Sequence, residues 1–321
     1  MEMKISEVAA LADRVLQEVE RAVVGKHTVL QKIMAAFLSS GGHVLMEDYP
    51  GLAKTLIANS FAAALGLSFK RIQFTPDLLP GDITGGYIYD RTTGQFSLRQ
   101  GPLFANIVLA DEINRASPRT QSALLEAMQE YQVTLEGETL RLPEPFIVVA
   151  TQNPIEYEGT FPLPEAQLDR FLVKLAVGYP TKEEEQEILR RRRARRQDEF
   201  DLHPVMDASG LTAMRQAVET VYLDPDIEEY IVELATRTRK HRSIAVGASP
   251  RAALALLKLG RSWAALQGRE YVLPDDIKMF VRPVLGHRLM VEPDLWTERN
   301  AVEDVITDVL NSVPVPVLKG V

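Results

Sequence analysis

Short apolar runs and helical patterns alternate along roughly the first half of the chain. Runs typical of buried strands occupy residues 43–46, 69–74, 106–110, 146–150 and 172–177. Stretches with helical spacing of apolar residues lie between them. This alternation predicts an α/β core in which a mostly parallel sheet is covered by helices.

Two predicted hairpins interrupt this pattern. In YIYDRTTGQFSLRQG, residues 87–101, alternating apolar residues flank the turn-rich DRTTG. In VTLEGETLRL, residues 133–142, the turn lies near Gly137. Both have the alternation and turn chemistry of a β-hairpin. We expect two hairpin inserts whose surfaces contact something outside the core.

After residue 180 the pattern is helical throughout. Thr181 and Glu184 predict a capping box, which opens a helix with acids first and six arginines at 190–196 last. This order suits the helix dipole, and Glu187 can pair with Arg191. Amphipathic helices are predicted over 226–239, 249–267 and 275–284. The expected division is a core at 1–180, a charged connector helix at 181–204 and an all-helical domain at 205–321.

Composition narrows the class of protein. The chain has 321 residues, of which 46% are hydrophobic and 25% charged, as in soluble globular proteins. Its net charge of −8 argues against broad binding to nucleic acid or acidic membranes. We therefore interpret the arginine run at 190–196 as a solvated connector or subunit contact rather than a nucleic-acid patch.

Other common site types and locations are disfavoured. The chain contains no cysteine, which excludes disulfides and thiol chemistry, and its five histidines lack the spacing of metal ligands. No apolar run approaches the ~20 residues of a membrane span. The first residues carry acids and helical spacing rather than the features of a signal peptide. We expect a cytoplasmic protein without membrane insertion.

The segment EDYPGLAKT, residues 47–55, carries the first chemical signal. It lies between an apolar run and a helical pattern, so it predicts a strand, a tight loop and a helix. At such a junction, loop N–H groups and the helix N-terminus bind anions. Lys54 would reach the β- and γ-phosphates of a nucleotide, and Thr55 would hold magnesium.

This segment departs from the strict phosphate-loop pattern, which has glycine where this chain has Asp48 and Ala53. Gly51 remains at the sharpest part of the loop, and Ala53 adds one methyl group. The carboxylate of Asp48 can turn away from the ligand and accept loop N–H bonds. The alternative is an ordinary turn with a chance Lys-Thr pair.

A second signal, IVLADE at residues 107–112, is a buried strand that ends in two acids. One carboxylate can orient a metal, and the other can take a proton from water. The sequence TQNP places Asn153 just past another strand. Since parallel strands deliver their carboxyl ends to one edge of a sheet, Asn153 can lie near Glu112 and help hold the attacking water. The alternative for Asn153 is a simple turn before proline.

Five motifs stand in a fixed order: VVG at 23–25, the EDYPGLAKT loop, ADEINRA, ATQNP and PLPEAQLDRF. In this order they closely resemble the MoxR family of AAA+ ATPases over nearly the full chain. The resemblance implies an αβα P-loop core with a helix-2 insert and a pre-sensor insert, followed by a helical lid. It also implies a ring, usually a hexamer, with ATP between subunits.

The resemblance also assigns roles to single residues. Adenine would contact Val24 and Gly25, and the phosphates would contact loop residues Tyr49, Pro50, Gly51, Leu52, Ala53, Lys54, Thr55 and Leu56. Magnesium (Mg²⁺) would be held by Thr55 and, through water, by Asp111. Glu112 would be the general base and Asn153 the polar sensor. Arg170 would be the arginine finger that reaches the neighbouring subunit.

The lid would supply Arg251 as the second sensor, and whether it acts in cis or in trans stays open. The alternative for Arg170 is an ion pair with Asp169 or Glu165 on its own surface. For Arg251 it is a surface arginine at a helix start. Arg115 and Arg119 could also face a neighbouring subunit.

The expected function is ATP-driven, chaperone-like remodelling of a protein client. Relatives often work with a partner that carries a von Willebrand factor A domain. This chain has no DxSxS motif, so that domain would come from another protein. The motor subunit of a metal chelatase shares the same core and is the alternative. A nucleic-acid motor is disfavoured by the charge, and a scaffold without turnover by the acid pair.

Overall fold

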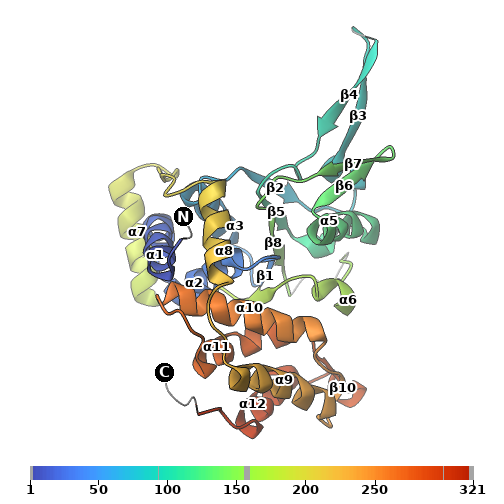
Figure 1. The fold of residues 1–321 in the computed structure, drawn as a ribbon. Coiled ribbons are helices and arrows are strands. Elements are labelled where there is room, and N and C mark those ends of the chain that lie inside the picture. Colours follow the sequence, from blue (N-terminus) through green and yellow to red (C-terminus); the bar gives the residue numbers. More distant parts are fainter. Residues whose placement is uncertain (1–2, 93, 155–159, 299, 318–321) are drawn as a thin grey trace.

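The core of the molecule is a five-stranded parallel sheet (Figure 1). The computed structural model describes residues 3–92, 94–154, 160–298 and 300–317. The strand order is β2-β5-β8-β1-β9. Their bounds are β1 (Val44–Glu47), β2 (Phe69–Gln73), β5 (Ile107–Asp111), β8 (Ile147–Gln152) and β9 (Val173–Leu175). All five predicted apolar runs are strands of this sheet.

Both faces of the sheet are buried at β1, β5 and β8, which explains why these inner strands are apolar runs, whereas the edge strand β2 keeps exposed polar side chains. On β1, Val44 and Met46 belong to one core cluster and Leu45 to the other. The first cluster joins the sheet to α1 (Ile5–Ala22), α2 (His27–Leu38) and α3 (Lys54–Ala64). The second joins it to α5 (Pro118–Glu130). The expected layering of helix, sheet and helix is confirmed.

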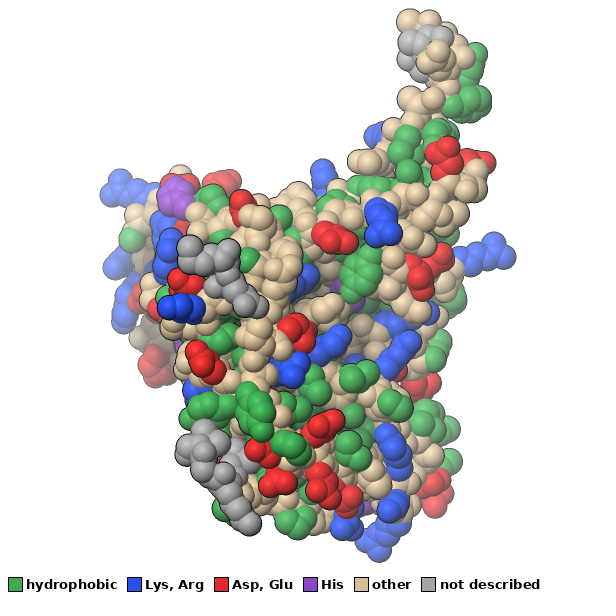
Figure 2. All heavy atoms as spheres, in the orientation of Figure 1, with side chains coloured by type: hydrophobic (Ala, Val, Ile, Leu, Met, Phe, Trp, Pro, Cys, Tyr) green, Lys and Arg blue, Asp and Glu red, His purple; other side chains and the backbone are tan. Residues whose placement is uncertain are grey.

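Both predicted hairpins are present. The first pairs β3 (Gly85–Asp90) with β4 (Gln95–Gln100) after the short α4 (Pro80–Thr84), and Thr93 in its turn lies outside the described residues. The second pairs β6 (Gln132–Leu135) with β7 (Glu138–Arg141). The β3–β4 hairpin projects away from the body and carries exposed apolar side chains (Figures 1 and 2). Among these, the rings of Tyr89 and Phe96 contact each other at an interplanar angle of 57°, with centroids 5.2 Å apart.

The remaining elements are mostly helical. They are α6 (Glu165–Leu168), α7 (Lys182–Arg195), α8 (Ala208–Val218), α9 (Pro225–Lys240), α10 (Pro250–Leu266), α11 (Pro274–Leu285), α12 (Ala301–Ser312) and the 3₁₀ turns η1 (Ile113–Arg115) and η2 (Pro293–Leu295). One short antiparallel pair, β10 (Ile244–Val246) with β11 (Met290–Val291), adds two strands to a lid that we expected to be entirely helical.

Helix α7 has the local structure that its sequence indicates. Glu184 N–H donates to Thr181 Oγ1 at 3.2 Å, and Thr181 N–H donates to Glu184 Oε2 at 2.9 Å. Arg191 pairs with Glu187 at 2.9 Å. Helix α7 lies beside α1 at one side of the molecule (Figure 1). No helix within the described ranges is long and apolar enough to cross a membrane.

Candidate nucleotide-hydrolysis site

The loop between β1 and α3 has the backbone conformation of an anion-binding turn. Gly51 and Ala53 both have positive φ, at 81° and 57°, and Ala53 directly precedes the first residue of α3. The first N–H groups of a helix have no partner within it, and such left-handed turns form anion-binding concavities. The loop therefore offers backbone donors where the sequence predicted phosphates.

Asp48 supports the loop from outside. Its Oδ1 accepts from Tyr49 N–H at 2.9 Å, and its Oδ2 accepts from Gly178 N–H at 2.6 Å. The residue is buried. The bond from Tyr49 is the loop N–H bond that the sequence predicted, and the bond from Gly178 also ties the loop to the segment that follows β9, which was not predicted.

One cavity of about 450 Å³ unites the loop with residues far away in the sequence. It is lined by Pro50, Gly51, Leu52, Ala53, Lys54, Thr55 and Leu56 of the loop and by Arg71, Asp111, Glu112, Thr151 and Asn153. The acid pair and Asn153 therefore meet the loop at the carboxyl edge of the sheet. Arg71 and Thr151 had not been singled out from the sequence.

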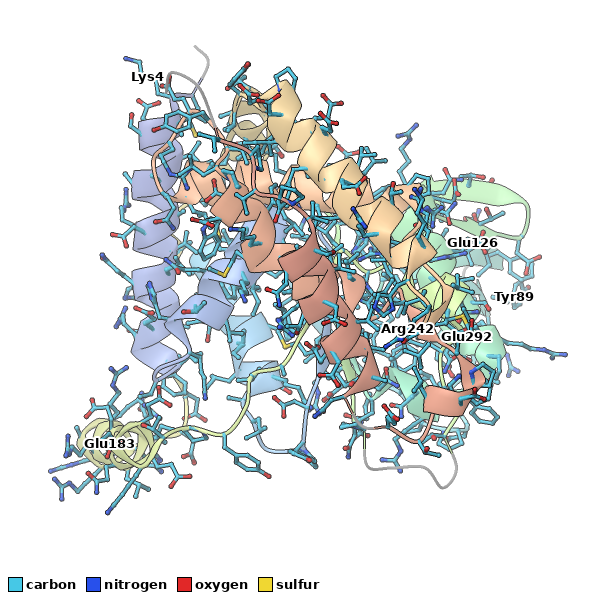
Figure 3. The ribbon with its side chains drawn as sticks, turned by 90° about the horizontal axis from the view of Figure 1, so that it is seen from below. Lys4, Tyr89, Glu126, Glu183, Arg242 and Glu292 are labelled. Atoms are coloured by element: carbon cyan, nitrogen blue, oxygen red, sulfur yellow. The ribbon has the colours of Figure 1, made fainter. Side chains whose placement is uncertain are left out.

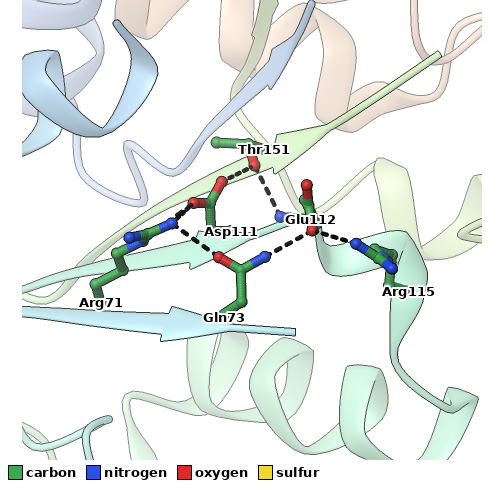
Figure 4. Close-up of polar contacts among 6 residues, drawn as sticks. All are labelled: Arg71, Gln73, Asp111, Glu112, Arg115 and Thr151. Carbon is green, nitrogen blue, oxygen red and sulfur yellow. Dashed lines mark hydrogen bonds and ion pairs between the residues drawn. The ribbon is translucent and has the colours of Figure 1, made fainter. Parts of the chain in front are cut away.

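The carboxylate of Asp111 has partners on both oxygens (Figure 4). Arg71 donates to Oδ2 through Nη2 at 2.6 Å and Nε at 3.1 Å. The hydroxyl of Thr151 donates to Oδ1 at 2.6 Å. These contacts hold the carboxylate at one orientation beside the loop.

Glu112 is held by a separate set of contacts. Its Oε2 accepts from Gln73 Nε2 at 2.6 Å and from Arg115 Nη1 at 2.9 Å, while its N–H donates to Thr151 Oγ1 at 2.8 Å. Its φ of 56° is left-handed, an uncommon state for a non-glycine residue. Strained backbone of this kind is concentrated at functional sites. Gln73 also accepts from Arg71 at 2.8 Å, so one polar network joins both acids.

Lys54 lies over the loop from the start of α3. Its Nζ donates to the carbonyl oxygens of Asp48 at 2.5 Å and Tyr49 at 3.2 Å. Partial burial lowers the pKa of Lys54, and the negative charges of Asp48, Asp111 and Glu112 oppose this shift. Lys54 thus lines the cavity with its ammonium group held by two loop carbonyl oxygens and within the electrostatic influence of three acids.

A second cavity of about 400 Å³ adjoins the first through shared loop residues. One wall consists of Ala22, Val23, Val24 and Lys26, and the opposite wall of Val177, Gly178 and Pro180. Gly25 itself has a φ of 69°, and a Cβ there would lie 2.1 Å from Glu184 Oε1. Because the Glu184 carboxylate ends a flexible side chain, the left-handed φ is the stronger reason for glycine at position 25, while Val24 lines the cavity.

Helix α7 and the segment after it form the third wall of this cavity, through Ile188, Arg191, Arg192, Arg195, Asp198 and Phe200. Half of the arginine run therefore faces the cavity, which we did not expect for a solvated connector. The two cavities together have the form of a nucleotide site, with an apolar compartment for a base and a polar one for phosphates.

Neither Arg170 nor Arg251 is among the described residues that line these two cavities. Arg170 lines another cavity, of about 270 Å³, with Glu126 and Glu130 of α5. Figure 3 shows Glu126 far across the molecule from Glu183 of α7. Within the described residues, Arg170 forms no ion pair with Asp169 or Glu165.

Asp169 is instead paired with two arginines of the lid. Arg288 donates to its Oδ1 at 2.7 Å, and Arg251 Nη1 lies 3.7 Å from its Oδ2. The side chain of Arg251 is more than half exposed. The structure thus brings Arg251 and Arg170 to the same segment, away from the loop of their own chain.

The chemistry of the first cavity fits a magnesium–nucleotide complex. The loop N–H groups and Lys54 complement phosphate, while the Thr55 hydroxyl and the Asp111 carboxylate are hard oxygen donors of the kind that Mg²⁺ prefers. The phosphate loop after β1, the acid pair after β5 and Asn153 after β8, followed by a helical lid, define an AAA+ ATPase.

Comparisons with known proteins agree with this class. Residues 43–173 match the ATPase family associated with various cellular activities (AAA), and residues 236–309 match the AAA lid domain. YeaC of Bacillus subtilis is 47% identical over 97% of this chain and 96% of its own length. Chaperone MoxR1 of Mycobacterium tuberculosis is 42% identical over 96% of this chain and 83% of its own.

A solved structure of an ATPase candidate from Cytophaga hutchinsonii superposes with a TM-score of 0.89 at 39% identity, covering 96% of each chain. The chain belongs to the MoxR family of AAA+ ATPases. It is a nucleotide-binding ATPase.

Proposed function

We propose that the chain hydrolyses MgATP at a site completed by a neighbouring subunit of a homo-oligomeric ring, a hexamer, and that hydrolysis drives chaperone-like remodelling of a protein client. One observation carries this proposal. The loop, the acid pair and Asn153 share a cavity, whereas Arg170 and Arg251 lie on another face of the same chain.

The residues of the cavity divide the work of hydrolysis. Lys54 and the loop N–H groups bind the phosphates, and Thr55 and Asp111 hold Mg²⁺, which neutralises phosphate charge when bound. Glu112 accepts the proton of the attacking water, and Asn153 orients that water. Val24 and the wall formed by α7 surround the adenine base, whereas Gly25, which is not among the described lining residues, shapes the turn beside them.

A finger supplied in trans makes turnover depend on assembly. An arginine that stabilises the transferring phosphoryl group is worth roughly 10³ to 10⁵ in rate. Because Arg251 contacts Asp169, next to Arg170, we propose that both arginines of one subunit serve the same neighbouring site. This assigns Arg251 to action in trans.

The division of the chain follows from these roles. We propose residues 1–180 as the nucleotide-binding core, 181–204 as a connector whose helix also closes the base compartment, and 205–321 as the lid. The client would meet exposed surfaces such as the aromatic side chains of the projecting β3–β4 hairpin. A partner with a von Willebrand factor A domain would be a separate protein, because this chain has no DxSxS motif.

The decisive experiment replaces the proposed base. Glu112→Gln should retain ATP binding and lose turnover by at least about a hundredfold, the usual contribution of a general base. Glu229→Gln, at an exposed acid of α9 that is not among the lining residues of the phosphate cavity or of the cavity with Arg170, is the matched control. Unchanged turnover in Glu112→Gln would contradict the assignment. The same variant with ATP should trap client and partner in a pull-down, while stimulation of the parent by DNA would favour a nucleic-acid motor.

A further inference from the structure

Arg288 is an almost completely enclosed charge at the boundary between lid and core. It follows α11, and its side chain is 4% exposed. A buried guanidinium is costly unless its donors are satisfied. Burial lowers the pKa of Arg288 from its ordinary value, and the hydrogen bond and charge of Asp169 oppose this shift.

All five N–H groups of Arg288 have acceptors. Nε donates to Asp169 Oδ1 at 2.7 Å; Nη2 donates to the carbonyl oxygens of Phe171 at 2.6 Å and Asp169 at 3.3 Å. Nη1 donates to the carbonyl oxygens of Leu172 at 3.2 Å and Val284 at 2.7 Å. Four of these five bonds therefore hold the short segment from Asp169 to Leu172, and one holds Arg288 to its own helix.

The segment that Arg288 holds is the one that carries Arg170. The guanidinium binds the residue before Arg170 and the two residues after it, so the backbone on both sides of the proposed finger is fixed to the lid. The neighbouring His287 adds a contact, since its Nε2 donates to the carbonyl oxygen of Phe171 at 3.1 Å. Arg288 itself is enclosed and cannot reach a neighbouring nucleotide.

We propose that Arg288 is a positioning residue for ATP hydrolysis, which couples the lid of one subunit to the finger that this subunit presents to its neighbour. This inference rests on the proposed function of Arg170. Because Arg288 bonds the lid to the segment from Asp169 to Leu172, a movement of the lid also moves this segment. Arginine suits this role because its planar guanidinium has five donors in a fixed geometry. The lid thereby sets whether Arg170 reaches the adjacent site.

Arg288→Lys tests the coupling because it keeps the charge and removes the fork. A displacement of about 1 Å in a catalytic group costs up to roughly a hundredfold in rate. We expect kcat to fall by about tenfold to a hundredfold with the KM for ATP unchanged. Asp169→Asn, which retains an acceptor for Arg288, should give a smaller fall. Arg269→Lys is the control, since Arg269 forms a comparable pair with Asp276 inside the lid, at 2.6 and 2.8 Å.

Mixing subunits separates positioning from a general defect of the lid. In a ring of Arg288→Lys and Glu112→Gln subunits, some sites combine an intact base with an intact finger, so turnover should exceed the sum of the separate variants. A lid defect that damages the site of its own subunit would not be restored in this way. The double variant Arg170→Ala/Arg288→Lys should be no slower than Arg170→Ala.

The outcomes also separate this inference from the proposed function. If Arg170→Ala is restored by mixing and Arg288→Lys is not, or if Arg288→Lys turns over like the parent, the coupling is wrong while the shared site stands. If Arg170→Ala itself retains full turnover, or is not restored by mixing, the shared site is wrong.

Discussion

Gln73 Nε2 donates a hydrogen bond to Glu112 Oε2 at 2.6 Å, from the end of β2 to the end of β5. Arg115 donates to the same oxygen. The proposed base is therefore engaged by two donors at one oxygen, and a rotation of this side chain towards a water molecule beside the phosphate loop would weaken these bonds.

Replacement of Gln73 by alanine should raise basal turnover. A hydrogen bond to a charged group contributes about 1.5–3 kcal/mol when buried and less at a site that is partly exposed. We therefore expect kcat to increase by about threefold to tenfold. Steady-state ATPase assays check the change in kcat, with Gln216→Ala, at an exposed position of α8, as the control. A fall in turnover would mean that Gln73 orients Glu112 for the reaction.

The polar network around the acids could be predicted only in part. Asp111 and Glu112 are adjacent in the sequence and end an apolar run, so one segment identifies them. Arg71 and Gln73 lie about forty residues earlier and reach the acids because β2 pairs with β5, with Gln73 opposite Asp111. Their spacing of two residues places them on one side of β2 and is the signal that could have marked them.

The inner strands β1, β5 and β8 were predictable because both of their faces are buried. The β10–β11 pair was not, since segments of three and two residues are too short to show alternation. The arginines of α7 were not placed beside the base compartment, because the charge pattern of a helix does not reveal which helix it packs against. Arg170 and Arg251 were found by their motifs, and their roles stay predictions.

Replacement of Ala53 by glycine should leave stability unchanged or raise it slightly. The left-handed φ of 57° costs a non-glycine residue about 1–2 kcal/mol, which glycine relieves. Glycine also loses about 0.5–1 kcal/mol more conformational entropy on folding, which offsets part of this gain. We expect a gain of roughly 0–1 kcal/mol in the free energy of unfolding. Denaturant titration measures it. Ala63→Gly, inside α3, is the matched control and should lose about 1 kcal/mol. An equal loss in both variants would contradict strain at Ala53.

Two buried histidines predict a loss of stability in mild acid. Burial lowers the pKa of His43 to about 4, although a hydrogen bond to the carbonyl oxygen of Met128 raises it. Burial likewise lowers the pKa of His287 well below its ordinary value. In the unfolded chain these groups bind protons near pH 6.5, so the unfolded state binds more protons than the folded state below that pH. The free energy of unfolding should therefore fall as the pH drops from 6.5 towards 4, by up to about 3 kcal/mol for His43.

Denaturant midpoints at pH 7 and pH 5 measure this dependence. His43→Gln should be less stable at pH 7, because its hydrogen bonds change, but should lose less stability on acidification than the parent. His203→Gln, at an exposed histidine, should retain the dependence of the parent on pH. Identical slopes for the parent and His43→Gln would contradict the contribution of His43.

The wall of the base compartment formed by α7 should affect ATP binding rather than turnover. The guanidinium of Arg195 lies 3.8 Å from the ring centroid of Phe200, and both residues line this compartment. An interaction of this kind contributes about 0.5–1 kcal/mol at exposed sites, and Arg195→Ala also removes part of the wall, so we expect the KM for ATP to rise by about threefold to tenfold. Because the adenine base of ATP contacts this wall equally before and during hydrolysis, kcat should not change.

Arg193→Ala is the matched control, since Arg193 is an exposed arginine of the same run that is not among the described residues lining the compartment. A fall in kcat with an unchanged KM would instead assign α7 to the contact between subunits.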